Sequence, residues 1–390
     1  MSGFRQVDPK QSFPELEERV LARWRERDVF GRSLANREGA DVWNFYEGPP
    51  TANGRPGSHH VLARAFKDVY PRYRTMRGYR VPRKAGWDCH GLPVELEVEK
   101  QLGISSKQEI EEYGIAEFNQ RCRESVFEYV EEWNRLTERI GFWIDLDDPY
   151  VTLENDYIES VWWSLGQLWE KGLLYEGHKV VPYCPRCGTA LSSHEVASGY
   201  RDVEDPSIYV RFPLLTEDGA DAGESLLVWT TTPWTLPGNE AVAAAPDVTY
   251  AKAQVDGETL ILAEPLIERV LGEGAVIVDR LPGRDLAGRH YKGPVFALSD
   301  REPGAFPVLA GDFVTTEDGT GAVHMAPGFG EEDQLLCAEH GIDVVCPMDS
   351  GGRYTAEVEP WAGLHVFDAN PEVIKALRAA GTLVRHDSYD

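Results

Sequence analysis

The sequence of 390 residues lacks the features that mark several protein classes. No segment approaches the roughly 18 uninterrupted apolar residues that a membrane-spanning helix needs. The first residues, MSGFRQVDPKQSF, contain no apolar core of a signal peptide. Six cysteines in a chain of this length do not make a small disulfide scaffold, and no repeat or low-complexity tract is present. We therefore expect a cytoplasmic globular protein with roughly two or three domains and no membrane contact.

Basic side chains are scarce, because 39 Lys and Arg stand against 65 Asp and Glu, for a net charge of -26. This balance argues against a polyanionic partner such as nucleic acid. The charge is segregated, however: residues 51–100 carry 10 basic and 5 acidic side chains, whereas residues 101–390 carry 21 and 51. Eight cations share one short segment with only Asp68 opposing them: Arg64, Lys67, Arg72, Arg74, Arg77, Arg80, Arg83 and Lys84. This segment is either a solvated helix face or the binding site of an anion.

Residues 14–77 have the pattern helix, strand, loop, helix. Residues 14–30 carry apolar side chains at helical spacing among charges, as in an amphipathic N-terminal arm. Residues 42–46 can form a buried strand, the Gly-, Pro- and Asn-rich run 48–57 predicts a loop, and residues 58–77 predict a helix. One side of that helix carries Val61, Leu62, Ala65, Val69 and Tyr73. A strand, a glycine-rich loop and a helix are the outline of a nucleotide-binding site.

The predicted secondary structure changes from mainly helical to mainly strand near residue 200. Residues 105–140 and 155–171 predict helices, and no long strand is expected before about residue 180. Beyond Tyr200, short strand-like runs such as YVRFPL, LLVWTTT, TYAKAQV and TLILAE alternate with Gly, Pro and Asp turns, and helix returns at residues 370–380. We expect a separate β-rich domain after residue 200.

Two histidines and two cysteines stand at positions where ligands are often held. His59 and His60 lie in the first turn of the predicted helix, where free N–H groups and the helix dipole favour phosphate, although such a pair is also common as a cap or a surface feature. Cys184 and Cys187 form a C-x-x-C pair, which is half of a zinc site or a redox dithiol. A redox pair should open a helix, whereas the following Gly188 predicts a turn. The remaining cysteines are expected to be inert buried thiols: Cys89, Cys122, Cys337 and Cys346.

Two strings, FYEGPPTANGRPGSHHVLARAFKD and RYRTMRGYRVPRKAGWDCHGLPVE, resemble the N-terminal catalytic half of class I aminoacyl-tRNA synthetases, and the first of them contains His59 and His60. WTTTPWTLPGN and GTGAVHMAPGFGEED are similar to the editing domain of the same family, and GWDCHGLPVE and WTTTPWT resemble its isoleucine branch. The resemblance implies an α/β fold, the first half of a class I Rossmann catalytic domain with an inserted, largely β editing domain. It implies a helical arm (1–44), the Rossmann half (45–177), a zinc-knuckle connector (178–200) and the editing, or CP1, domain (201–388).

The resemblance also implies residue roles in the catalytic half. Pro49 and Asp88 match positions that hold the α-ammonium group of the amino acid, although without the resemblance Asp88 is better interpreted as the N-cap of a helix at residues 90–94. His60 matches the last histidine of the family's signature and is expected to act on the ATP phosphates. The implied ATP contacts are Pro50, Asn53, Gly54, Gly57, His59 and His60. The signature departs from the family pattern, because Gly57 and His59 stand in exchanged order. An imidazole at position 59 needs room beside the adenine, and we expect Gly57 to provide it by letting the loop shift.

In the second half, a threonine run alone predicts only an edge strand. The resemblance assigns Asp333 to the α-ammonium of a wrong amino acid, and it places Thr230, Thr231, Thr232 and His324 around its side chain and ester, with a positioned water for hydrolysis. Trp234, Thr235 and Asn239 are implied to line the same pocket. Cys184 and Cys187 are implied to supply half of a Zn²⁺ site.

The function implied by the resemblance is that of an aminoacyl-tRNA ligase with a deacylase activity. Such an enzyme activates isoleucine with ATP and Mg²⁺, transfers it to tRNA(Ile), hydrolyses misacylated Val-tRNA(Ile) and is expected to be a monomer. No KMSKS-like loop, second Rossmann half or second cysteine pair occurs in these residues, so this chain alone is expected to lack full aminoacylation. The alternatives are a fragment of a valine- or leucine-type synthetase and a stand-alone aminoacyl-tRNA deacylase.

Overall fold

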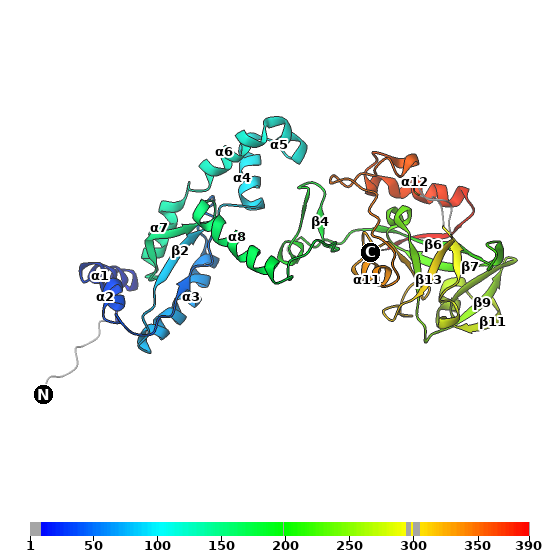
Figure 1. Cartoon of the computed structure of the whole chain (residues 1–390), viewed down its shortest axis with the longest axis horizontal. Helices are drawn as coiled ribbons and strands as arrows, with labels where there is room; N and C mark the ends of the chain where they lie inside the picture. The colour runs from blue at the N-terminus through cyan, green and yellow to red at the C-terminus, as the bar shows by residue number, and fades with distance from the viewer. Residues whose placement is uncertain (1–8, 198, 294–297, 299–304, 390) are drawn as a thin grey trace. The chain divides into compact units, whose positions relative to one another are not determined.

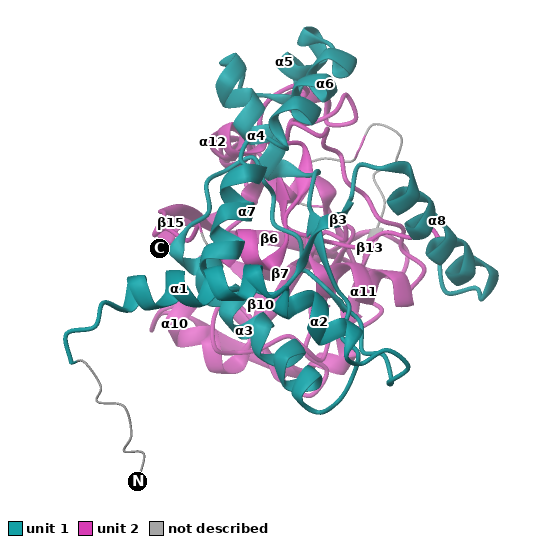
Figure 2. Ribbon diagram, turned by 90° about the vertical axis from the view of Figure 1, so that its left-hand side faces the viewer, with its two compact units in different colours: residues 1–175 teal, residues 176–390 magenta. Residues whose placement is uncertain are grey.

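The computed structural model describes residues 9–197, 199–293, 298 and 305–389. The chain divides into two compact units, Met1–Tyr175 and Glu176–Asp390 (Figures 1 and 2). Each unit contains hydrophobic clusters of its own. Among the described helices, none has both the length and the apolar character that crossing a membrane requires.

Unit 1 consists of a small parallel sheet and the helices that surround it. Its strands are β1 (Phe45–Tyr46), β2 (Arg83–Trp87) and β3 (Asp145–Val151), in the order β1-β2-β3. Its described helices are α1 (Phe13–Glu26), α2 (Val29–Ala35), α3 (Ser58–Met76), α4 (Leu92–Leu102), α5 (Lys107–Tyr113), α6 (Ile115–Ser125), α7 (Val130–Arg139) and α8 (Asn155–Glu170). Helix α3 is the crossover between the parallel strands β1 and β2, as the strand–loop–helix pattern predicts.

The sequence predicts no long strand before about residue 180, and the structure has two short strands there, β2 and β3, that the sequence pattern did not indicate. Both strands carry charges that conceal them in the sequence: Arg83 and Lys84 open β2, and Asp145, Asp147 and Asp148 lie in β3. Lys84 bonds to Asp148 across the sheet at 2.9 Å. The predicted strand at 42–46 is shorter than expected, since only Phe45 and Tyr46 are in β1 and Val42 makes an isolated bridge to Arg80.

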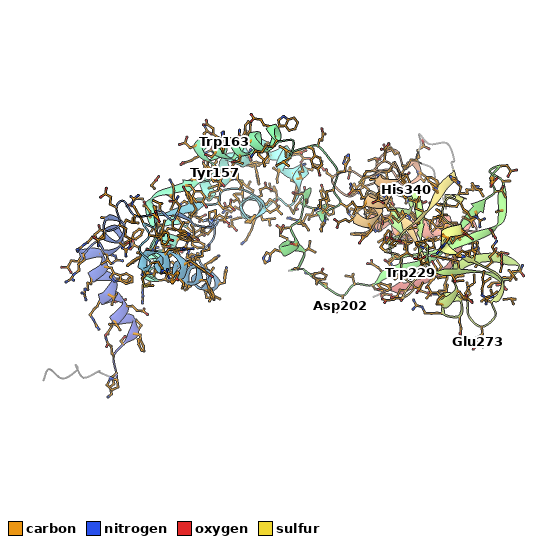
Figure 3. The ribbon with its side chains drawn as sticks, turned by 60° about the horizontal axis from the view of Figure 1, so that its bottom comes forward. Tyr157, Trp163, Asp202, Trp229, Glu273 and His340 are labelled. Carbon is orange, nitrogen blue, oxygen red and sulfur yellow. The ribbon has the colours of Figure 1, made fainter. Side chains whose placement is uncertain are left out.

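Helix α3 begins at the predicted residue and ends one residue before the predicted end, and most of its apolar side chains are exposed. Its buried residues are Arg64, Pro71 and Thr75. Its apolar side chains form an exposed stripe, at 50–76% exposure: Leu62, Phe66, Val69, Tyr70, Tyr73 and Met76. The inward face is polar because the Arg64 guanidinium lies over the Trp133 ring at 4.9 Å and donates to Thr137 Oγ1. Helix α8 has no buried residue, and Trp163 is 68% exposed (Figure 3).

The basic segment is largely paired inside unit 1, so the interpretation as a solvated helix face was wrong for much of it. The Arg83 side chain is fully buried and bonds to Thr75 Oγ1 at 3.0 Å, the Trp143 carbonyl at 3.1 Å and Asp68 at 3.3 Å. Burial lowers the pKa of Arg83 to about 10, although Asp68 opposes the shift. Lys67 pairs with Glu47 at 2.6 Å. These cations stabilise the fold, and they leave fewer free charges for an external anion than the sequence suggests.

The N-terminal arm is held to the sheet by arginine–aromatic contacts. The guanidinium of Arg72 lies 4.0 Å from the Trp143 ring centroid and 5.3 Å from that of Trp24. The two tryptophan rings meet edge to face at 5.1 Å. Because Trp24 is on α1, this stack joins the arm to α3 and to the segment before β3.

Unit 2 is built on a large sheet with mixed pairing. Its strand order is β11-β9-β10-β7-β6-β12-β13-β8-β14, and β15 pairs with β6. The strands are β6 (Asp205–Leu215), β7 (Asp221–Thr230), β8 (Ala241–Ala244), β9 (Thr249–Val255), β10 (Glu258–Ala263), β11 (Val276–Pro282), β12 (His290–Lys292), β13 (Ala305–Ala310), β14 (Ala322–Met325) and β15 (Leu383–Tyr389). The main core lies between this sheet and α12 (Val366–Ala379). The predicted β-rich domain is therefore confirmed in its secondary structure.

Short elements complete unit 2. The cysteine hairpin consists of β4 (Tyr183–Cys184) and β5 (Thr189–Ala190), and helix α9 (Ser193–Ala197) follows it. Helices α10 (Ile267–Leu271) and α11 (Glu331–Glu339) and the 3-10 turns η1 (Pro233–Gly238), η2 (Glu264–Leu266), η3 (Gly283–Asp285) and η4 (Glu359–Trp361) connect the strands. The turn η1 and the N-terminus of α11 contribute directly to the pocket described below.

Candidate functional site

The first group of predicted residues lies in unit 1, on the loop between β1 and α3. This loop continues alongside the end of β2: the Glu47 N–H donates to the Lys84 carbonyl at 2.9 Å, the Asp88 N–H donates to the Pro50 carbonyl at 3.0 Å, and Thr51 pairs with Asp88. Further along, Trp133 Nε1 donates to the Gly54 carbonyl at 2.9 Å. The loop is therefore fixed at both ends, by β2 and by α7.

His60 sits in the first turn of α3 with a defined hydrogen-bonding role. Its Nδ1 accepts from the Gly57 N–H at 2.9 Å, so the proton of the neutral ring is on Nε2. Burial lowers the pKa of His60, with smaller contributions in the same direction from His59, Arg64 and Lys67. A neutral imidazole with a free N–H at a helix N-terminus is a donor suited to a phosphate oxygen.

His59 is exposed and its ring centroid lies 3.8 Å from that of His60. A Cβ atom on Gly57 would lie 2.9 Å from Cε1 and 3.0 Å from Nδ1 of His59. Positions 57 and 59 are therefore sterically coupled, because the side chain of His59 occupies the space that a side chain at position 57 would need.

The alternative role of Asp88 as a helix cap was wrong. Helix α4 begins at Leu92 with Gly91 as its N-cap, whereas Asp88 Oδ1 accepts only a local bond from the His90 N–H at 3.3 Å. Asp88 is half-buried beside Pro50, so the structure brings it next to the loop that carries Pro49. A carboxylate and a backbone carbonyl in this position can receive an ammonium group.

Cys184 and Cys187 lie in the β4–β5 hairpin of unit 2 and not at the start of a helix. The Gly188 N–H donates to the Cys184 carbonyl at 2.9 Å, and Gly188 has a φ of 64°, as the predicted turn requires. Burial raises the pKa of Cys187. Within the described ranges, no group of three or more His, Cys, Asp or Glu side chains is arranged to hold a metal ion. Cys346 is exposed, contrary to the prediction of a buried thiol.

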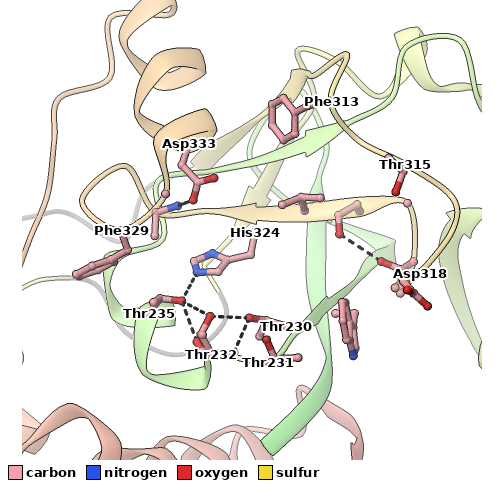
Figure 4. A pocket seen from close by; sticks show the side chains of 18 of the residues that line it. Thr230, Thr231, Thr232, Thr235, Phe313, Thr315, Asp318, His324, Phe329 and Asp333 are labelled. Atoms are coloured by element: carbon pink, nitrogen blue, oxygen red, sulfur yellow. Dashed lines mark hydrogen bonds between the residues drawn. The ribbon is translucent and has the colours of Figure 1, made fainter. Parts of the chain in front are cut away.

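The second group of predicted residues lines one pocket of about 410 Å³ in unit 2 (Figure 4). Strand β7 ends at Thr230, and the chain turns through Thr231 and Thr232 into η1. Strand β14 supplies His324, and the N-terminus of α11 supplies Asp333. The pocket-lining residues that the sequence singled out are Thr230, Thr231, Thr232, Trp234, Thr235, His324 and Asp333. Asn239 lies behind them, buried against His324.

Hydroxyl groups dominate one side of this pocket. The Thr235 hydroxyl oxygen is 2.9 Å from His324 Nε2 and 3.2 Å from Thr232 Oγ1, which in turn is 3.2 Å from Thr230 Oγ1 (Figure 4). Burial lowers the pKa of His324 to about 4, so the ring is neutral at physiological pH. The site therefore offers neutral hydrogen-bonding groups where an ester or a polarised water can bind.

Asp333 supplies the carboxylate of the pocket. Its Oδ2 accepts from the Ala326 N–H at 2.8 Å, and its carboxylate packs directly over Gly330. Burial raises the pKa of Asp333, and the Ala326 N–H opposes the shift. A half-buried carboxylate at the edge of a pocket is a binding site for an ammonium group, because an opposite charge offsets its desolvation.

Sequence reasoning missed several residues that shape this pocket. Phe329 packs edge to face on Trp234 at 5.1 Å, and Phe313 and Trp229 also contribute to the lining. Tyr291, outside the lining, bonds to Asn239 at 2.5 Å. Phe329 lies within GTGAVHMAPGFGEED, the string that contains Asp333, so the sequence could have indicated it as a pocket residue. Nothing around Tyr291 distinguishes it from an ordinary core residue.

Comparison with known proteins places these features in a family context. The family model described as tRNA synthetases class I (I, L, M and V) matches residues 19–361. Isoleucine–tRNA ligase of Thermus thermophilus is 54% identical over 379 residues, which are 97% of this chain and 36% of that protein. The isoleucine–tRNA ligase of Streptomyces coelicolor is 52% identical over 389 residues, which are 99% of this chain and 37% of that protein. The chain thus spans little more than a third of the length of these relatives. The solved structure titled "The crystal structure of GlLeuRS-CP1" matches 47% of this chain and 100% of its own, with 16% identity and a TM-score of 0.38.

Proposed function

Because this chain belongs to the class I tRNA synthetases of the isoleucine, leucine, methionine and valine group, we propose that it supplies the first half of the synthetic site and the editing domain of an isoleucine–tRNA ligase. Identities near 50% to isoleucine–tRNA ligases over almost the whole chain support the isoleucine branch. The single observation that carries the editing part is the pocket in which the threonine row (Thr230, Thr231 and Thr232) meets His324 and Asp333.

In the proposed synthetic site, unit 1 is the first half of a Rossmann domain, with parallel strands and a phosphate-binding helix start. ATP, with Mg²⁺, would lie against the loop and the first turn of α3, where His60 offers Nε2–H to the phosphates. The isoleucine ammonium would bind between the Pro49 carbonyl and the Asp88 carboxylate. The ATP contacts proposed are Pro50, Asn53, Gly54, Gly57, His59 and His60.

In the proposed editing site, Asp333 binds the α-ammonium of a misacylated amino acid, and the hydroxyls of Thr230, Thr231 and Thr232 surround its side chain and ester. His324 and Thr235 complete the polar wall, while Trp234 and Asn239 shape and support it. Hydrolysis would use a water molecule held by these neutral groups. A second pocket is needed because one methylene distinguishes isoleucine from valine by only about 1–3 kcal/mol, a limit for which isoleucine–tRNA ligases are the standard example.

The proposed domain limits follow the same assignment: an arm at 1–44, the Rossmann half at 45–177, a connector at 178–200 and the editing domain at 201–388. Zn²⁺ does not fit the connector as it stands, because Cys184 and Cys187 provide two thiolates and a structural zinc site needs four ligands. The hairpin is proposed as half of such a site, and no chemical step depends on it.

The test of the editing function is deacylation of Val-tRNA(Ile) by this chain in the absence of ATP. We expect hydrolysis of Val-tRNA(Ile), little hydrolysis of Ile-tRNA(Ile), and loss of the activity in Asp333→Ala. Equal hydrolysis of both tRNAs, or none of either, would overturn the editing proposal. The synthetic function is tested by isoleucine-dependent exchange of pyrophosphate into ATP with the complete enzyme, and a preference for valine or leucine would reassign the branch.

A further inference from the structure

Behind the threonine row lies a chain of buried side chains in which the direction of every hydrogen bond can be worked out. It runs from Tyr291 on β12 through Asn239 to His324 on β14 and then to Thr235 in η1. Asn239 and His324 are 5% and 7% exposed, and Tyr291 is fully buried. Solvent therefore has very little access to these groups, and each donor is expected to find its acceptor within the protein.

The orientation of the Asn239 amide is fixed by its neighbours. One of its two terminal atoms faces the Ala241 carbonyl at 2.9 Å and the Met325 carbonyl at 3.5 Å. Carbonyl oxygens only accept, so that atom is the nitrogen, Nδ2. The other atom, Oδ1, faces the Tyr291 hydroxyl at 2.5 Å. Burial raises the pKa of Tyr291 well above its ordinary value, so the hydroxyl keeps its proton and donates it to Oδ1.

The amide orientation decides where the proton of His324 lies. Asn239 Nδ2 is 2.8 Å from His324 Nδ1, and an amide nitrogen only donates. His324 Nδ1 must therefore be unprotonated, and the neutral ring carries its proton on Nε2. That nitrogen is 2.9 Å from Thr235 Oγ1, so the imidazole donates to the threonine hydroxyl. The hydroxyl proton of Thr235 is then free for the Thr232 carbonyl at 2.8 Å.

We propose that Tyr291 is a positioning residue of the editing site: through Asn239 it holds His324 in the Nε2–H tautomer, so that His324 donates to Thr235 and does not act as a general base. This inference rests on the proposed deacylation function. A base would need a free lone pair facing the pocket, whereas the lone pair of His324 faces Asn239. The reverse tautomer would turn the Thr235 hydroxyl proton away from the Thr232 carbonyl and toward the imidazole.

Tyr291 is suited to this role because its ring and its hydroxyl have separate partners. The ring packs against Phe212 at 5.1 Å and Phe306 at 5.8 Å, within the main core. Tyr291→Phe keeps these contacts and removes only the hydroxyl. The amide of Asn239 then loses the hydrogen bond to its Oδ1 and is held on its Nδ2 side alone, by the Ala241 and Met325 carbonyls, so its hold on the imidazole weakens.

The experiment uses this chain with ¹⁵N-labelled histidine. Long-range proton–nitrogen NMR spectra report directly which ring nitrogen of His324 is protonated, with His324→Gln for assignment. We expect Nε2–H in the native chain, a mixture of tautomers in Tyr291→Phe, and deacylation of Val-tRNA(Ile) about tenfold slower in that variant, as for the loss of one buried hydrogen bond. In Asn239→Asp, an acceptor replaces Nδ2, and we expect the proton of His324 to move to Nδ1.

Tyr250→Phe is the matched control. Tyr250 is also fully buried, and its hydroxyl accepts from the Ala245 N–H at 2.9 Å and donates to the Gly321 carbonyl, outside this chain of bonds. We expect it to lower the melting temperature but to leave the His324 tautomer unchanged. A native chain with Nδ1–H, or a Tyr291→Phe variant that alters neither tautomer nor deacylation relative to this control, overturns the inference. A native chain with the expected tautomer, sensitive to Tyr291→Phe, but without any deacylation would support the tautomer control and refute the proposed function instead.

Discussion

Replacing Gly330 with alanine is expected to displace Asp333 in the pocket of unit 2 and slow deacylation there, while leaving the fold intact. Gly330 is the N-cap of α11, with φ of -124° and ψ of 138°, an extended conformation that alanine adopts without strain. The obstacle is steric. A Cβ atom at this position would lie 2.6 Å from Asp333 Cγ, 2.7 Å from Oδ1 and 2.8 Å from Oδ2.

The displacement follows from these distances. Ordinary contacts of a Cβ atom begin at 3.4 Å, so Asp333 Cγ must move by the difference from 2.6 Å, at least 0.8 Å along that line. The bond from the Ala326 N–H, now 2.8 Å, cannot survive such a shift unchanged. A displacement of about 1 Å in a positioning group can reduce catalysis by about 10²-fold. The cost in stability is only about 1 kcal/mol, because alanine is a poorer N-cap than glycine.

The assay is deacylation of Val-tRNA(Ile) by the chain, together with its thermal unfolding. Gly274→Ala is the control, since a Cβ atom there meets nothing within 4 Å and the backbone has no positive φ. We expect kcat/KM to fall by about 10²-fold in Gly330→Ala and to stay within about twofold in Gly274→Ala. If the two variants deacylate equally well, Asp333 either tolerates the shift or has no part in the site, and the geometric argument is wrong.

Three further predictions concern stability. Glu224, which pairs with Lys252 at 2.7 Å and Arg289 at 2.6 Å, has a pKa that burial raises but that these two cations lower more, so the net shift is downward. A carboxylate whose pKa is lowered by folding stabilises the folded state at any pH above its unfolded-state pKa, and this stabilisation is lost as the pH falls through the folded-state pKa. Urea unfolding should therefore show that Glu224→Gln is about 1–2 kcal/mol less stable than the native chain near pH 7, and the difference should disappear below about pH 4. A difference that stays constant with pH contradicts this. Arg72→Lys should destabilise unit 1 by about 1–2 kcal/mol in the same measurement, because lysine cannot stack on Trp143 as a planar guanidinium does, and Arg19→Lys on the exposed arm should have no effect. Gly57→His alone should lower the melting temperature through its clash with His59, and adding His59→Gly should restore part of the loss; a double variant whose loss equals the sum of the losses in the two singles would show that the two positions are not sterically coupled.

The sequence predicts the limits of elements well where local patterning and tertiary environment agree. Helix α3 was expected at 58–77 and ends at Met76, and α8 was expected at 155–171 and ends at Glu170. The Gly-Pro-Asn run before α3 cannot continue a strand or a helix, so the loop is set by backbone chemistry alone. The β-rich texture after residue 200 is equally local, because β-branched residues recur between turn residues.

Other features depend on contacts that are distant in sequence. Arg64 and Arg83 can be buried because they contact Trp133, Thr137 and Trp143, which lie much later in the sequence. The residues adjacent to either arginine do not predict these contacts. For the same reason the sequence showed no sign of β2 or of the exposure of the apolar side of α3. In the candidate site, motif strings identified the pocket lining, whereas the support from Tyr291 comes from a strand that nothing in the sequence connects with His324.

The ladder that joins residues 47–51 to residues 84–88 has a thermodynamic consequence for unit 1. The loop proposed to bind ATP and the carboxylate proposed to bind isoleucine share this ladder, through the bond from the Asp88 N–H to the Pro50 carbonyl. Ordering one of them by a ligand therefore orders the other, and the second ligand loses less conformational entropy on binding. The two substrates should bind with positive synergy, and by linkage each should raise the affinity of the other by the same factor.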